Sequence, residues 1–292
     1  MTAPRLKLAE RAAQEAARGS GQTDFPICPF RIAEEAGIEV VRKPPGIEGV
    51  SGGIIFGNSP VIFHSTAIRS RPFQRFTVAH ELGHYFVEGH WDRLERTGAH
   101  VSRAGFGRAR DPLETEADHF AACLLMPGHL VRRLLSRQPA GLSAVRALSL
   151  DAETSLTASA IRVAHCSDEP FAMVMSQNGV ISYAFMSETF RRLRPARRLQ
   201  KGAPLPEGAS RRFSLDPRRV AARDEICVQT RMENWFGSGD RDLDEEIVGL
   251  GSYDRTLTIL SCEAVSGIED EEDCEEDERL VDSWIPRHAY RR

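Results

Sequence analysis

The sequence predicts an α+β fold, because two β-hairpin signals are separated by a long run of helical patterns. The first hairpin consists of two β-prone runs, 53–56 and 61–64, on either side of a Gly-Asn-Ser turn. The second consists of the runs 171–175 and 180–185, with an Asn-Gly turn between them. Between the hairpins, apolar residues recur at helical spacing. This order is typical of a protein in which helices and strands are segregated.

The first hairpin is expected to lie among several helices. Residues 5–18 place small and apolar side chains on one helical stripe, and 38–41 read as a strand. A long helix is predicted from the possible N-cap Ser70 to Gly89, with Pro72 in its first turn. Residues 90–111 are rich in Gly, Arg and polar residues, which predicts a long loop. A second helix is expected from Pro112 to Leu125.

Further short elements are expected beyond this helix. We place a domain boundary at residue 145, so that 1–145 form the first domain. Residues 146–292 are then a helical connector followed by a smaller α/β domain that serves sensing or substrate docking. The expected helices are 128–137, 143–149 and 154–165, and the expected later strands are 225–230 and 256–260.

Composition favours a packed protein in the cytoplasm. The chain has 292 residues, of which 41% are hydrophobic and 27% charged, so a core can form and wholesale disorder is excluded. No apolar run approaches the roughly 18 residues that a membrane span needs, and the N-terminus has no apolar signal-peptide core. The six cysteines form no C-x-x-C pair, which indicates free thiols rather than a cysteine-zinc site.

The charges are unevenly distributed. Residues 191–223 hold eleven basic and two acidic residues, whereas 263–282 hold eleven acidic and one basic residue. We interpret the basic stretch as a solvated linker, since charge runs usually are. Residues 155–161 suit a helix-turn-helix, but no convincing recognition helix follows, so DNA binding has weaker support.

The decisive motif is the run His-Glu-Leu-Gly-His at 80–84. On a helix, His80 and His84 lie on one face and can bind the same metal ion. Glu81 lies about 100° around the helix, where it can reach a metal-bound water and act as a general base. This pattern predicts a zinc site that activates water.

A catalytic zinc needs a third protein ligand and one open position. Glu114 and Asp118 share one face of the second helix, whereas Glu116 points away. We therefore predict Glu114 as the ligand and Asp118 as the acceptor of a hydrogen bond from a ligating histidine. The runner-up ligand is Glu116, and weaker candidates are His90, His100 and His119.

Two segments together resemble the ImmA/IrrE family of metallo-endopeptidases. They are residues 76–85, Phe-Thr-Val-Ala-His-Glu-Leu-Gly-His-Tyr, and 114–127, Glu-Thr-Glu-Ala-Asp-His-Phe-Ala-Ala-Cys-Leu-Leu-Met-Pro. The resemblance covers 25–135 and implies a zincin-like fold. It also implies zinc bound by His80, His84 and Glu114, with Glu81 as the catalytic glutamate.

The resemblance further implies cleavage of a cytoplasmic regulatory protein, a repressor or an antitoxin-like partner, as members of the family do under stress. The alternative is a non-catalytic regulator or DNA-binding protein with a structural or vestigial zinc site. The intact Glu81 favours the enzyme, because a purely structural site needs no general base.

Two further roles are open at this point. Strand 61–64 is a hypothetical edge strand that pairs with substrate backbone. The residue that stabilises the oxyanion is one of several neighbours of the motif, namely Tyr85, His90, His100 and Arg103.

Overall fold

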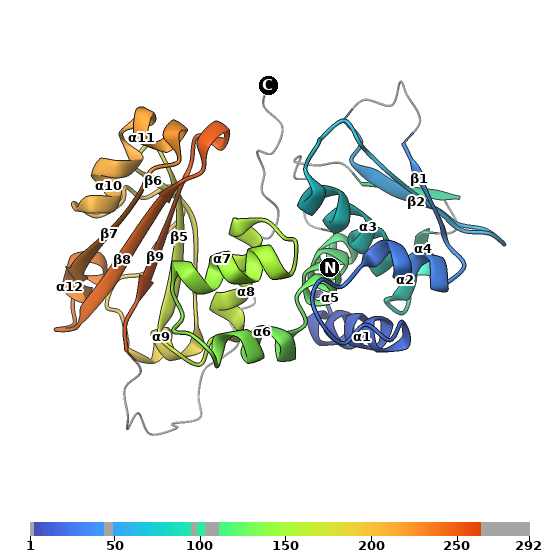
Figure 1. Ribbon diagram of the computed structural model, residues 1–292, viewed down its shortest axis with the longest axis horizontal. Helices are drawn as coiled ribbons and strands as arrows, with labels where there is room; N and C mark the ends of the chain where they lie inside the picture. Colours follow the sequence, from blue (N-terminus) through green and yellow to red (C-terminus); the bar gives the residue numbers. More distant parts are fainter. Residues whose placement is uncertain (1–2, 44–48, 95–97, 103–110, 264–292) are drawn as a thin grey trace. The chain divides into compact units, whose positions relative to one another are not determined.

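The computed structural model describes residues 3–43, 49–94, 98–102 and 111–263. They divide into two units, each of which combines helices with a β-sheet (Figure 1). The first unit contains the residues up to Leu130 together with Leu148–Ala158, and the second contains Val131–Ala147 together with the residues from Ser159 onward. The α+β class is confirmed, while the single boundary at residue 145 stays a prediction.

The sheet of the first unit has the strand order β1-β3-β2-β4. The predicted hairpin is present as β2 (Gly52–Ile55) and β3 (Val61–His64), which pair antiparallel. β1 (Glu39–Arg42) runs parallel to β3, and β4 (Ala99–Ser102) pairs antiparallel with β2 at the outer edge. β3 therefore lies inside the sheet, and the hypothesis that it is an edge strand open to substrate is wrong.

The expected loop at 90–111 was wrong in its described part, which contains α4 (His90–Leu94) and β4. Both elements are too short to show a helical or alternating pattern in the sequence. The partner of β4 is also remote, since His100 pairs with Ile54. Only the tertiary pairing reveals this strand.

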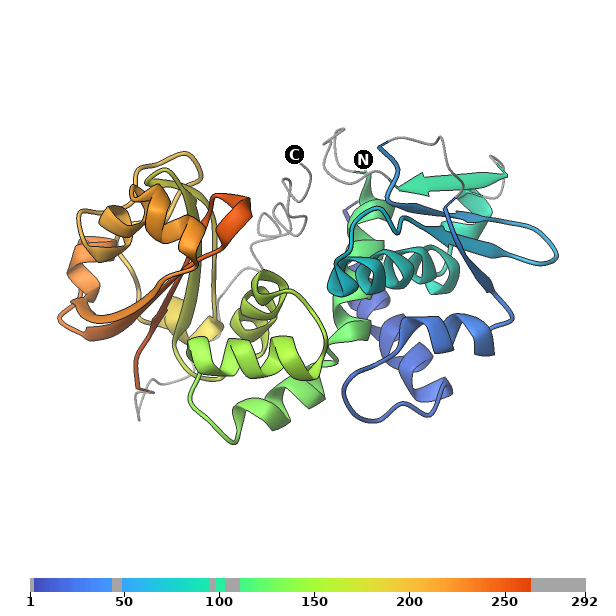
Figure 2. The ribbon, with the colours of Figure 1, turned by 45° about the horizontal axis from the view of Figure 1, so that its top comes forward.

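The helices of the first unit pack around α3 (Arg71–Phe86), which carries the His-Glu-Leu-Gly-His motif. α3 has the sheet on one side and α1 (Leu6–Gly19) and α2 (Pro29–Glu35) on the other (Figure 2). Ser70 occupies the N-cap position, but its side chain makes no capping hydrogen bond. α5 (Pro112–Leu125) is capped by the Asp111 side chain, which accepts a hydrogen bond from the backbone N–H of Leu113.

The shared core of these helices is apolar. Ala9 and Ala13 of α1, Leu82 of α3 and Phe120 of α5 have no exposed surface. Because α3 is covered on several sides, most of its middle turns are buried, including the polar side chains of its motif. The fold thus holds the motif in a site from which bulk water is largely excluded.

The second unit contains a five-stranded sheet of order β6-β5-β9-β8-β7, in which every neighbouring pair is antiparallel. The predicted hairpin and later strands are present, and β8 is an additional strand between β9 and β7. Among the described residues, no helix combines the length and the apolar character that a membrane crossing needs. The remaining elements are α6 (Gly128–Leu135), α7 (Leu142–Asp151), α8 (Leu156–Cys166), β5 (Phe171–Gln177), β6 (Val180–Met186), α9 (Glu188–Arg192), α10 (Ala209–Ser214), α11 (Pro217–Ala222), β7 (Glu225–Arg231), α12 (Met232–Phe236), β8 (Asp242–Gly249), η2 (Gly251–Tyr253) and β9 (Thr256–Ser261).

The basic stretch 191–223 is folded, so its interpretation as a solvated linker was wrong. It contains α10 and α11, which lie against the five-stranded sheet (Figure 1). Phe213 and Val220 are buried in a cluster with Ile247 of β8. Apolar residues between the arginines therefore anchor these helices. The acidic run lies outside the described residues from position 264 onward.

Candidate metal centre

α3 and α5 approach each other closely at Gly83. A Cβ atom at Gly83 would lie only 2.9 Å from the Cα of Ala117, so no larger residue fits without a shift of backbone. This contact lies between His80 and His84 on one helix and beside Glu114 on the other. A glycine and an alanine at the crossing thus bring the ligand candidates of the two helices together.

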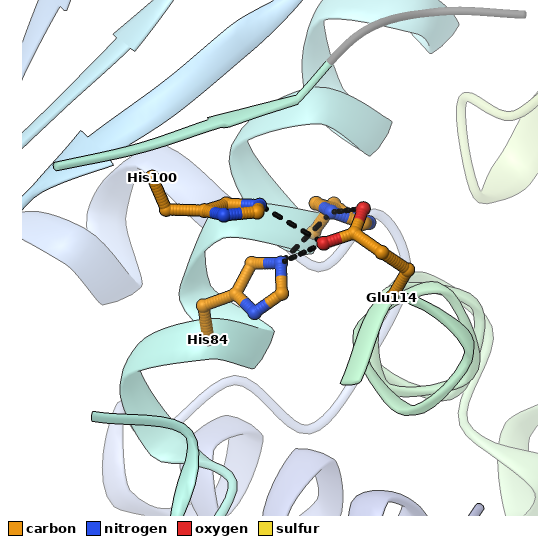
Figure 3. A group of neighbouring side chains, drawn as sticks. His84, His100 and Glu114 are labelled. Carbon is orange, nitrogen blue, oxygen red and sulfur yellow. Dashed lines mark hydrogen bonds and ion pairs between the residues drawn. The ribbon is translucent and has the colours of Figure 1, made fainter. Parts of the chain in front are cut away.

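Four side chains converge next to this crossing: His80, His84, His100 and Glu114. One ligand atom from each lies within 4.8 Å of all the others, and Figure 3 shows His84, His100 and Glu114 pointing toward one another. The Nε2 atoms of His80 and His84 are 3.1 Å apart. They lie 3.5 and 3.3 Å from the carboxylate oxygens of Glu114. A tetrahedral zinc site with bonds of about 2.0–2.1 Å has edges of about 3.3–3.4 Å, so these residues fit the ion.

A chain of hydrogen bonds determines which nitrogen of His84 is free. Nε2 of His90 lies 3.0 Å from Oε2 of Glu116, and Nδ1 of His90 lies 3.2 Å from Nδ1 of His84. Burial raises the pKa of Glu116, but hydrogen bonds from Arg5 outweigh it and lower that pKa, so Glu116 is an acceptor. His90 therefore donates from Nε2 and accepts at Nδ1, and His84 donates from Nδ1. Nε2 of His84 then carries a lone pair that points into the group of four.

His80 has its own carboxylate partner. Its Nδ1 lies 2.8 Å from Oδ1 of Asp118, an arrangement that leaves Nε2 facing the group. Two imidazole lone pairs at 3.1 Å repel each other unless a proton or a metal ion lies between them. The geometry of the two histidines is thus suited to a cation.

The carboxylates of the site favour positive charge there. Burial lowers the pKa of His80, but Asp118 and Glu114 outweigh it and hold that pKa well above its usual value. Burial alone would raise the pKa of Glu114, yet His100, His80 and His84 hold it far below its usual value. Burial lowers the pKa of His84 to about 3, so its imidazole is neutral near pH 7, as a metal ligand must be.

Glu81 lies beside the group of four and is fully buried. Neither of its carboxylate oxygens accepts a well-aligned hydrogen bond from a described residue, although the Ser102 hydroxyl lies close by. Burial raises its pKa, which makes it a stronger base than an exposed glutamate. β2 passes close to this carboxylate at Gly52, where a Cβ atom would clash with the methyl group of Thr77 and lie 3.5 Å from Oε1 of Glu81.

The structure separates the remaining candidates. Glu116 lies away from the group and pairs with Arg5 at 2.8 Å, and His90 lies behind His84. His119 lies against Cys123, with 3.5 Å between Nε2 and Sγ. Tyr85 packs against Phe86 and Trp91, and Arg103 lies outside the described residues.

His100 belongs to the group of four, although the sequence placed it only among the weaker ligand candidates. It belongs to β4, and its imidazole faces the other three side chains of the group. Its strand has four residues, so the alternation that places His100 and Ser102 on one face spans a single repeat. Without the pairing of β4 to β2, nothing in the sequence connects His100 with the motif helix.

Comparison with protein families gives a match between residues 33–160 and the IrrE N-terminal-like domain, a peptidase family. This part of the chain is an IrrE N-terminal-like domain. The resemblance to the ImmA/IrrE family that the two motifs predict is therefore confirmed. All four residues of the metal group lie inside the IrrE N-terminal-like domain, and the family implies a metallopeptidase type of hydrolase or a regulator.

A solved structure, a Mycobacterium tuberculosis transcriptional regulator, resembles the chain with a TM-score of 0.57 at 13% identity. The match covers 88% of this chain and 76% of that one, so the shared fold includes both the IrrE N-terminal-like domain of this chain and the part that follows it. At this identity the likeness concerns the fold alone. No curated protein matches the sequence.

Proposed function

We propose that the protein is a zinc-dependent endopeptidase that cleaves a specific cytoplasmic regulatory protein. His80, His84 and Glu114 would hold the ion, and Asp118 would orient His80. When bound, zinc acidifies water and polarises a peptide carbonyl. Nitrogen and carboxylate donors at these spacings support zinc over magnesium or calcium, which prefer oxygen ligands alone.

Glu81 would act as the general base of the hydrolysis. It lies on the same helix as His80 and His84, and burial raises the pKa of its carboxyl group. The proton of the attacking water would pass to a carboxylate oxygen of Glu81, which can then deliver it to the leaving amine. The closed surroundings of Glu81 strengthen the interactions that orient this proton transfer.

The observation that carries the proposal is the complete burial of Glu81 without a well-aligned hydrogen bond. A buried carboxylate normally has hydrogen bonds or a charge partner, since its burial is otherwise unfavourable. Glu81 is 0% exposed and accepts no well-aligned hydrogen bond among the described residues, although Ser102 and His80 lie nearby. It also lies next to a group of metal-ligand side chains. A structural metal site needs no general base, whereas a site that activates water needs one, and a buried carboxylate such as Glu81 can serve as that base.

A regulatory protein is the proposed substrate class, either a repressor or an antitoxin-like protein. The support comes from the IrrE-like family and from a fold shared with a transcriptional regulator. The second unit would serve docking or sensing, so that generic peptides are poor substrates. A regulator that acts without cleavage is the alternative, and Glu81 separates the two because only the peptidase requires its carboxylate.

The test compares the wild type with Glu81→Gln in an extract of the source cells. New protein N-termini are labelled and identified by mass spectrometry after incubation with each zinc-loaded protein. We expect cleavage sites that appear with the wild type and whose rate of formation falls by about 100-fold or more in Glu81→Gln, because the general base is lost. Zinc content should be the same in both. Equal cleavage by the two proteins, or no cleavage by either, would contradict the proposal.

A further inference from the structure

His100 reaches the metal group from the sheet rather than from the motif helices. It lies in the middle of β4, where it pairs with Ile54 of β2. Its ring centroid is 4.3 Å from that of His84, and its Nε2 lies 2.9 Å from Oε1 of Glu114. The imidazole thus reaches the group from the strand, whereas His84 and Glu114 reach it from the helices, as Figure 3 shows.

The Nε2 atom of His100 is buried and makes no well-aligned hydrogen bond to a described residue, although it forms an ion pair with Oε1 of Glu114 at 2.9 Å. The short distance to Glu114 therefore brings the two atoms together without the direction that a hydrogen bond needs. A buried imidazole nitrogen whose hydrogen-bonding capacity is poorly satisfied is unfavourable, and such atoms in native proteins commonly face a ligand or an ion. Here the nitrogen belongs to the same cluster as the three ligand candidates.

We propose that His100 is a fourth protein ligand, which closes the coordination of the metal in the resting protein. This inference rests on the proposed function. Four protein ligands are typical of a closed zinc site, whereas a catalytic site keeps one position for water or substrate. The resting enzyme is therefore latent, and a substrate or docking partner must displace His100 before hydrolysis can begin. Glu114, at 2.9 Å, can accept a hydrogen bond from the displaced imidazole after a small rotation.

The experiment measures metal binding in the full-length chain, so that it does not depend on a known substrate. Zinc affinity is measured by competition with a chromophoric chelator for the wild type and His100→Ala. The matched control is His129→Ala, since His129 is an exposed histidine on α6. We expect the dissociation constant of His100→Ala to rise by about 100-fold or more, beyond the roughly 10- to 100-fold that the loss of an outer hydrogen-bond partner costs.

A second readout reports the open position directly. The wild type and His100→Ala are each loaded with cobalt(II), and the visible absorption of the metal is followed during titration with acetohydroxamate. The spectrum of His100→Ala should change at an acetohydroxamate concentration at least about tenfold lower than the one that the wild type requires, because no protein ligand has to leave the metal first. His100→Gln, which is closer in size, serves as the second variant if alanine disturbs folding.

Equal zinc affinity and equal acetohydroxamate response in the wild type and His100→Ala would overturn the fourth-ligand proposal while leaving the three-ligand enzyme intact. A wild type that binds neither zinc nor cobalt would instead overturn the proposed function, and this inference with it. The two failures are therefore distinguishable.

Discussion

At the scale of single residues, the direction of each hydrogen bond determines which atoms face the metal. The ionised Glu116 carboxylate can only accept hydrogen bonds, so it sets the direction of the two hydrogen bonds that link it through His90 to His84. Arg5 fixes Glu116 in turn, through its backbone N–H at 2.9 Å and its guanidinium at 2.8 Å. A residue near the N-terminus therefore helps to hold His84 in the tautomer that a metal requires.

These hydrogen bonds make His90 a positioning residue, so its replacement should weaken zinc binding. In His90→Ala, Nδ1 of His84 loses its acceptor, and we expect zinc affinity to fall by roughly 10- to 100-fold. His90→Gln should recover part of the loss, because an amide can accept from His84 and donate to Glu116. Competition with a chelator measures both variants beside His129→Ala. An affinity of His90→Ala equal to that of the control would show that the chain has no such role.

At the scale of elements, the site depends on how closely α3 and α5 pack. Gly83 lies in the motif itself, between the two histidines, and Ala117 lies in the facing segment of α5. The small residues of both motifs therefore have a physical role beside the ligands. They set the distance between the helices that carry His80, His84 and Glu114.

Replacing Gly83 with alanine should separate the two helices, since the added Cβ would meet backbone at 2.9 Å. We expect destabilisation of about 1–3 kcal/mol and a loss of zinc affinity, as for other overpacked interiors. Gly19→Ala is the matched control, because a Cβ atom there meets nothing within 4 Å. Denaturant unfolding and zinc titration measure both. If Gly83→Ala behaves like Gly19→Ala, the close approach does not matter.

Elements with a local signal could be predicted from the sequence, and those that depend on remote pairing could not. α3 and α5 show helical spacing with prolines in their first turns, and the β2–β3 hairpin has a turn between two β-prone runs. β4 has only four residues and a partner far away in the chain. The helix-borne site residues were therefore predicted, whereas the convergence of His100 was not.

At the scale of the whole molecule, each unit builds its own sheet, and the two sheets differ. The four-stranded sheet includes a parallel pair, β1 and β3, whereas the five-stranded sheet is wholly antiparallel. The sequence predicted the second unit from its Asn-Gly hairpin, but charge patterning misled the interpretation of 191–223. Counting the arginines gives no weight to Phe213 and Val220, the apolar residues between them. Their burial against Ile247 holds this stretch in a folded state.

The central claim for the molecule is a zinc site made by residues from separate helices, with Glu114 and not Glu116 as the carboxylate ligand. Elemental analysis of the full-length protein, purified without chelators, tests it most directly in the wild type, Glu114→Gln and Glu116→Gln. We predict about one zinc per chain in the wild type, a much lower zinc content in Glu114→Gln, and retention with weaker affinity in Glu116→Gln. A wild type without zinc after reconstitution, or equal zinc content in the two variants, would contradict the account.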